Sequence, residues 1–126
     1  MPSREFDLGD VVSITANALV SSRGMAGLKD LLEYLVDRPD LPKQMFPMAM
    51  RLSRPWILQR HGQLADLEVP DWVNSHAYAN RWVMQQKTRL GYTTLHIDPL
   101  PPELWERAEA KFFAEYRGRI IYENGN

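Results

Sequence analysis

The sequence predicts one mainly α-helical (α+β) domain spanning residues 1–126, with about five helices and a small two-stranded sheet near the C-terminus. Three observations support this fold class. Apolar residues recur at the helical period of about 3.6 residues through most of the chain. Prolines and glycines separate these periodic segments from one another. Only residues 92–97 and 119–122 have the β-branched and aromatic composition of strands.

The first helix is expected to follow Asp7, a residue type that caps helix N-termini, and Asp10 lies where an acid complements the helix dipole. One face of this helix carries Leu8, Val11, Val12, Thr15 and Leu19. After a break at residues 21–24, a second helix over residues 25–37 ends before two prolines, because proline cannot continue a helix. Its buried stripe is expected to contain Met25, Leu28, Leu31, Leu32, Leu35 and Val36.

The middle of the chain contains its most apolar segment, and prolines divide it. Pro47 and Pro55 each suit the first turn of a short helix, and Gly62 is a natural stop. After a connector, the longest helix is predicted over residues 71–90, with Gly91 as its C-terminal cap. The face of that helix expected to point inward carries Trp72, His76, Ala79, Val83 and Leu90.

The C-terminal part is expected to contain a strand over residues 92–97, a stiff proline-rich link and a last helix over residues 102–117, capped by Gly118. The inward face of this helix is expected to carry Leu104, Trp105, Ala108, Phe112 and Tyr116. A second short strand is expected over residues 119–122. Because two strands are marginal by themselves, they must pair with each other or with another subunit and pack on helices.

Charge is unevenly distributed, although the net charge is only −1. Residues 41–97 hold seven bases against three acids, whereas residues 1–40 and 98–126 carry net charges of −3 and −2. A positive middle segment attracts an anionic partner even when the net charge is near zero. The alternative is that its bases lie on solvated helix faces and pair with the acidic ends of the same chain. The pI of 6.3 is lower than is typical of a dedicated nucleic-acid-binding protein.

The sequence contains no motif for catalysis, a cofactor or a metal. Cysteine is absent, and the three histidines fall in three elements without the spacing that places two ligands on one helix face. His76 is interpreted as a core residue. Asp98, two residues after His96, is interpreted as a turn former. No nucleophile elbow or glycine-rich phosphate loop occurs. The missing motifs predict a protein without enzymatic activity, cofactor or metal. No apolar run is long enough to span a bilayer, so we also expect a soluble, cytoplasmic protein without a membrane partner.

The residues expected to contact a partner lie mainly in the proline-divided middle segment. Methionine and arginine beside aromatic residues are typical of protein-recognition surfaces, although flexible core packing is the alternative. The candidate partner-binding residues are Lys43, Met45, Met48, Arg51, Arg54, Trp56 and Arg60. A secondary patch on the long helix contains Tyr78, Arg81, Trp82 and Arg89. Its aromatic residues lie off the main apolar face, and exposed aromatic residues there are typical of a groove or a homo-oligomer contact.

Several stretches resemble a family of small tailed-phage and prophage proteins that is described as a domain of unknown function. Residues 4–15, with Leu19-Val20-Ser21 and Gly27 after them, are similar to that family's "LGDVLSITTGRLLS" pattern, and residues 59–65 to a later element. The family's Thr-Gly is replaced here by Ala16-Asn17, and the stretch around residues 43–51 also departs from it. The resemblance implies a phage or prophage accessory protein acting in a bacterial cytoplasm, without an assigned activity.

The leading hypothesis is therefore a non-catalytic phage or prophage protein that binds, and thereby inhibits, a host or defence protein. Antagonism of a CRISPR system is one form of such activity. One alternative is a protein that binds nucleic acid through the basic segment 41–97. Another is a nucleotide-binding sponge in which Arg81, Trp82, Arg89 and Tyr92 hold an anionic ligand between subunits.

Overall fold

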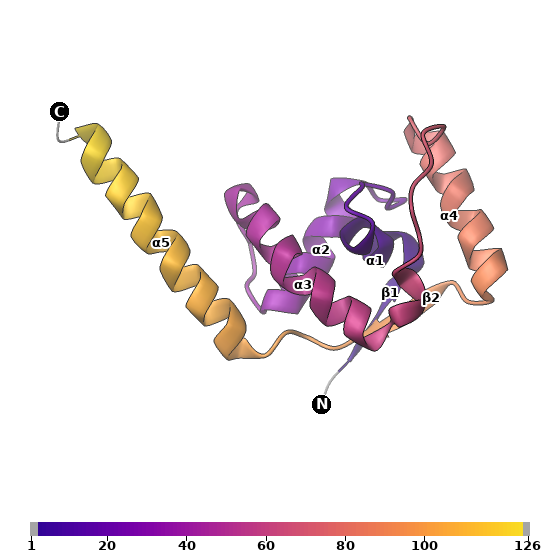
Figure 1. Cartoon of the computed structure of the whole chain (residues 1–126), viewed down its shortest axis with the longest axis horizontal. Helices are drawn as coiled ribbons and strands as arrows, with labels where there is room; N and C mark the ends of the chain where they lie inside the picture. The colour runs from indigo at the N-terminus through magenta and orange to yellow at the C-terminus, as the bar shows by residue number, and fades with distance from the viewer. Residues whose placement is uncertain (1–2, 125–126) are drawn as a thin grey trace.

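Five α-helices and a two-stranded antiparallel sheet form the part of the chain that the computed structural model describes, which is the backbone of residues 3–124 and the side chains of residues 3–115 (Figure 1). The mainly helical class and the small sheet agree with the prediction. In chain order the elements are β1 (Arg4–Asp7), α1 (Leu8–Thr15), α2 (Met25–Val36), α3 (Phe46–Arg60), α4 (His76–Leu90), β2 (Thr94–Ile97) and α5 (Pro102–Asn124), with short 3₁₀ turns η1 (Lys43–Met45) and η2 (Gly62–Leu64) on either side of α3.

The sheet joins the start of the chain to its later part. β1 and β2 are antiparallel, with Arg4 opposite Ile97 and Asp7 opposite Thr94. The strand predicted over residues 92–97 is therefore present, but the partner predicted over residues 119–122 is wrong, because that backbone belongs to α5. Four residues are too few to separate a strand from one more helical turn, and extending an existing helix adds a hydrogen bond for each residue fixed.

The core is built around α1, whose eight residues are all buried. α1 contacts α2, α3 and α4, so this short helix lies at the centre of the molecule (Figure 1). α1 ends at Thr15, whereas the predicted apolar face extended to Leu19. The helix cannot continue because Asn17 takes a left-handed conformation with φ of 52°. Leu19, expected on the buried face, is consequently 48% exposed.

α2 and α3 pack on α1 and on each other. The bounds of α2 match the prediction to within one residue, although Met25 at its first position is exposed. The prediction of separate short helices at Pro47 and Pro55 is wrong, because α3 is continuous and Pro55 lies inside it. Pro55 and Arg51, four residues earlier, both face solvent, so water can reach the backbone carbonyl that proline leaves without a helical donor.

α4 begins at His76 rather than at residue 71. Ser75 caps it by accepting the Tyr78 N–H at 3.2 Å, and Gly91 ends it with a φ of 85°, as predicted. Trp72 and His76 are exposed, so the expectation that they point inward is wrong. Ala79 and Val83 are buried as predicted, and Trp82 is buried on the same face.

α5 is the longest described helix and runs away from the rest of the molecule after its first turns (Figure 1). Trp105 is buried as predicted, whereas Leu104 is exposed, and Tyr116 lies outside the residues whose side chains are described. The predicted stop at Gly118 is wrong, because the helical backbone continues through it. Among the described residues, no helix combines the length and apolar character needed to cross a membrane.

Candidate functional site

The structure divides the predicted partner-binding residues between the core and two separate surface regions. Met45 is 2% exposed and Met48 is half-buried against the core, so the expectation that these methionines form an exposed surface is wrong for Met45. Lys43 is exposed in η1. The remaining residues lie along α3, and Arg54 and Arg60 are six positions apart, about 9 Å along the helix axis.

The first surface region is a hollow of about 360 Å³ beside the N-terminal half of α3, which we call the basic hollow. Its lining consists of Ile14, Asn17, Pro47, Met50, Arg51 and Arg54. Arg54 donates its Nε–H to the Thr15 carbonyl at 3.0 Å, at the C-terminal end of α1, where a cation complements the helix dipole. Arg54 is thereby held in one orientation, and Arg51 is exposed beside it.

The second surface region is a pocket of about 630 Å³ at the C-terminal half of α3, which we call the aromatic pocket. The Arg60 guanidinium carbon lies 3.2 Å from the centre of the Trp56 ring. Trp56 donates its indole N–H to the Asp98 carbonyl at 3.0 Å, and the Arg60 Nε is 3.8 Å from the Asp98 carboxylate. Trp56 and Arg60 are thus brought together with the link before α5, away from the basic hollow.

The secondary patch on α4 is only partly present. Tyr78 is 43% exposed with the Arg81 guanidinium 5.6 Å from its ring centre, and Arg89 donates to Gln86 on the same helix. Trp82 is only 4% exposed, so the expectation that it lies on the surface is wrong. Its position three residues after buried Ala79 is the helical signal that would have predicted this.

Most bases of the middle segment have no acidic partner within the described residues. Arg60 pairs with Asp98, and Lys87 lies 2.6 Å from Asp7, so the idea that the bases pair with the acidic ends explains two of the seven. No carboxylate of the described side chains lies within 4.0 Å of the other five, which are Lys43, Arg51, Arg54, Arg81 and Arg89. Their positive charge remains available to an anionic surface.

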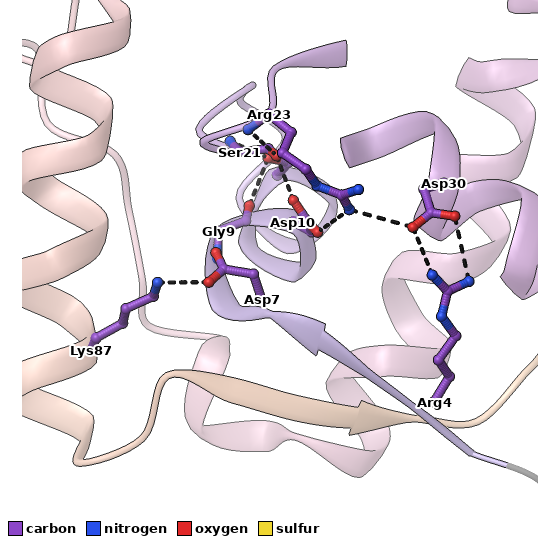
Figure 2. A network of polar contacts seen from close by, with 9 residues as sticks. Arg4, Asp7, Gly9, Asp10, Ser21, Arg23, Asp30 and Lys87 are labelled. Carbon is purple, nitrogen blue, oxygen red and sulfur yellow. Dashed lines mark hydrogen bonds and ion pairs between the residues drawn. The ribbon is translucent and has the colours of Figure 1, made fainter. Parts of the chain in front are cut away.

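A polar network that sequence reasoning missed joins α1, α2 and β1 (Figure 2). Asp10 is 1% exposed and accepts hydrogen bonds from the Ser21 hydroxyl and, at 2.9 Å, from Arg23. Arg23 also lies 3.4 Å from Asp30, which Arg4 contacts at 2.9 Å. The hydrogen bond to Asp10 raises the pKa of the Arg23 guanidinium, against the effect of burial. Charges therefore alternate in sign from the core to the surface.

The small residues Ser13 and Gly27 also lie next to this polar network. The Ser13 hydroxyl donates to the Gly9 carbonyl at 2.8 Å and accepts the Val20 and Ser21 N–H groups at 3.1 Å, which turns the chain back after α1. A Cβ atom at Gly27 would overlap the Ser21 and Asp10 side-chain oxygens. Gly9, Ser13, Ser21 and Gly27 therefore hold the fold together, and none of them lines the basic hollow or the aromatic pocket.

The chemistry available at these surfaces is recognition by charge and aromatic contact. Within residues whose side chains are described, no cluster of three histidine or carboxylate groups could hold a metal ion. The His61 Nε2 lies 3.1 Å from the His96 carbonyl, and the His96 ring lies 3.4 Å from Glu5. These are contacts between β1, β2 and the end of α3, and none of them faces the basic hollow or the aromatic pocket.

Comparison with known proteins finds one similarity. Residues 6–67 match the model of a family described as "Domain of unknown function (DUF7736)", and the chain is similar to that family over this range. The range contains α1, α2 and α3, the basic hollow and most of the polar network. No curated protein and no solved structure matches the chain. A similarity to a family of unknown function is therefore found over residues 6–67, and the description of that family mentions neither phage nor the expected N-terminal motif.

Proposed function

We propose that this protein is a non-catalytic accessory protein that binds a host or defence protein through the basic hollow and inhibits it. The observation that carries this proposal is that Arg51 and Arg54 lie side by side on the exposed face of α3, at a hollow, with no carboxylate partner among the described side chains. An acidic partner surface would supply the missing counter-charges. Arginine is enriched at protein interfaces and often dominates their binding energy.

The surroundings of these arginines favour a preformed contact surface. Arg54 is already oriented by the Thr15 carbonyl, and Pro47 in the first turn of α3 restricts the backbone next to the hollow. Met50 provides an apolar, adaptable wall. Because little conformational freedom is lost when such a surface binds, a small hollow is sufficient for a specific contact.

The proposed setting is the cytoplasm of an infected bacterium, which is what the sequence resemblance to tailed-phage and prophage proteins implies. An accessory protein there acts on host components, and a defence protein is the target that a non-catalytic binder can inhibit by occupying one surface. Antagonism of a CRISPR effector is one form of this proposal. The effector's acidic contact surface would then be the ligand of the basic hollow.

The test is capture of a partner from nuclease-treated bacterial lysate by the tagged protein and by a charge-reversed variant. Replacing Arg51 and Arg54 with glutamate is expected to abolish capture and inhibitory activity, whereas the melting temperature should fall only modestly, because the hydrogen bond from Arg54 to the Thr15 carbonyl is lost. The matched control replaces Arg107 and Lys111 with glutamate and should behave like wild type. Both are exposed bases of α5 without a carboxylate partner among the described residues. Full activity of the Arg51 and Arg54 variant would refute the proposal.

Nucleic acid is the second candidate partner, and a specific feature of α4 favours it. Arg81 and Arg89 lack carboxylate partners among the described residues, and Arg81 lies over exposed Tyr78. A mobility-shift assay over a range of salt concentrations tests it, since phosphate contacts weaken steeply as salt rises, and absence of binding at about 50 mM salt would exclude it. The nucleotide-sponge alternative is weakened, because Trp82 is buried and cannot stack on a ligand.

A further inference from the structure

The aromatic pocket is a second concave surface, and its chemistry differs from that of the basic hollow. It lies between α2, the end of α3 and the proline-rich link at residues 99–102. Six side chains supply its charge and aromatic surface, namely Tyr34, Asp37, Trp56, Arg60, Asp98 and Glu103. Its volume of about 630 Å³ falls within the range of small-ligand sites.

The charges of the pocket favour a cation. Three of the lining side chains are carboxylates and one is a guanidinium, so the pocket has a net charge of −2. Only Asp98 is engaged, by Arg60 at 3.8 Å, whereas Asp37 and Glu103 have no cation within 4.0 Å among the described side chains. An anionic ligand such as a nucleotide would meet this excess negative charge and be repelled.

The aromatic rings are fixed in place by their own polar atoms. The Tyr34 hydroxyl donates to the Ile97 carbonyl at 2.6 Å, and the Trp56 indole N–H is bound by the Asp98 carbonyl. Burial and, secondly, the nearby Asp98 charge raise the pKa of Tyr34, which keeps its hydroxyl protonated. Two oriented rings therefore border the three carboxylates.

Arg60 shows which group this surface accepts. Its guanidinium stacks on the Trp56 ring and lies toward Asp98, which is the arrangement of a cation held by an aromatic face and a carboxylate. Arg60 thus occupies part of the aromatic pocket itself, and its side chain is 38% exposed at the rim of that pocket. The remaining volume is bordered by Tyr34 and by the two carboxylates that lack a cationic partner.

We propose that the aromatic pocket binds a guanidinium or ammonium group, carried either by an arginine or lysine side chain of a peptide or by a free organic cation. This site is separate from the basic hollow, so it does not depend on the function proposed above. A guanidinium next to Asp37 and Glu103 would neutralise the two unpaired carboxylates. The apolar wall formed by Leu100 and the prolines of the link would accommodate the hydrocarbon stem of the same side chain.

The probes are agmatine, a small dication that carries a guanidinium and an ammonium group, and the capped tripeptides Ala-Arg-Ala and Ala-Glu-Ala, each titrated into the full chain by calorimetry and followed by thermal shift. Agmatine and the arginine peptide are expected to bind and to raise the melting temperature, because both bind the folded state. Tighter binding of the arginine peptide would identify a protein segment as the source, and equal or tighter binding of agmatine a small molecule. Equal binding of the glutamate peptide, or no binding by either cation at millimolar concentration, would overturn the proposal.

Charge-neutralising variants assign the binding to this pocket. Glu103→Gln, at a side chain with no ion pair among the described residues, and Asp98→Asn are each expected to weaken agmatine binding by roughly two- to fivefold. Glu115→Gln, at an exposed acid of α5 that does not line the pocket, should bind like wild type. The Arg51 and Arg54 double variant should also bind normally. Unchanged affinity in both pocket variants would place the cation elsewhere and refute the assignment.

Discussion

The Nζ of Lys87 in α4 lies 2.6 Å from one carboxylate oxygen of Asp7, and the other oxygen of Asp7 accepts the Gly9 N–H at 2.9 Å (Figure 2). Asp7 therefore closes the start of α1 and also holds α4, which is far away in sequence, against the core. The two roles use different oxygen atoms. Because they are chemically separate, mutation can distinguish them.

Replacing Asp7 with alanine removes both the N-cap and the ion pair, and we expect a loss of about 1–2 kcal/mol in the free energy of unfolding. Lys87→Met removes only the ion pair, which is partly exposed, and should cost less than about 1 kcal/mol. Urea denaturation of both single variants and the double variant measures the coupling. A loss in Lys87→Met as large as that in Asp7→Ala would show that the cap contributes little.

Gly27→Ala is expected to destabilise the fold by about 1–3 kcal/mol, because the new methyl group would overlap the Ser21 and Asp10 oxygens of the buried network. Gly62→Ala is the control, since a Cβ atom there meets nothing within 4 Å, and it should change stability by less than about 0.5 kcal/mol. Thermal unfolding of both variants tests the difference. Equal melting temperatures would mean that the α1–α2 junction relaxes to admit the methyl group.

Pro55→Ala is expected to stabilise α3, since alanine restores the N–H that the helix interior lacks. The gain should be about 1–2 kcal/mol, after allowing for the greater freedom of the unfolded chain. Pro47→Ala, in the first turn where no helical N–H bond is needed, should give no gain. Denaturant midpoints of the two variants provide the comparison, and a destabilised Pro55→Ala variant would contradict the expectation.

Ionisation of Tyr34 should lower the free energy of unfolding at alkaline pH. Its folded-state pKa is raised above the ordinary value of 10.0, so the unfolded chain loses the phenolic proton first. The contribution of protonated Tyr34 to the free energy of unfolding is complete below pH 10.0, and it is lost as the pH rises through the folded-state pKa. Tyr34→Phe removes this dependence and also the hydrogen bond to Ile97, which is worth about 1 kcal/mol. The gap in unfolding free energy between wild type and variant should therefore narrow above pH 10.0 and stay constant below it.

The candidate site was predictable in part. The sequence placed Arg51, Arg54, Trp56 and Arg60 in the proline-divided middle segment, but it predicted two short helices there and not the single continuous α3. Their division between a basic hollow and an aromatic pocket was not predictable. Asn17 and Tyr34 complete those sites from other elements, and no local pattern indicates which distant side chain lies opposite a given helix face.

The sequence by itself determined features whose cause lies within a few neighbouring residues. Asp7 caps α1, Gly91 ends α4 in a left-handed conformation, and the apolar period of α2 sets its bounds. Each depends on backbone hydrogen bonds or steric limits between residues close in the chain, so composition and spacing suffice to predict them.

Only the tertiary structure decided which strand pairs with β2, how Asp10 is satisfied in the core and where Trp82 points. β1 has a single buried residue, Phe6, and so carries little periodic signal of its own. Asp10 is stable in the core because Ser21 and Arg23, beyond the end of α1, supply its hydrogen bonds. Interactions of this kind depend on how the helices pack, and packing is a property of the whole core rather than of any one segment.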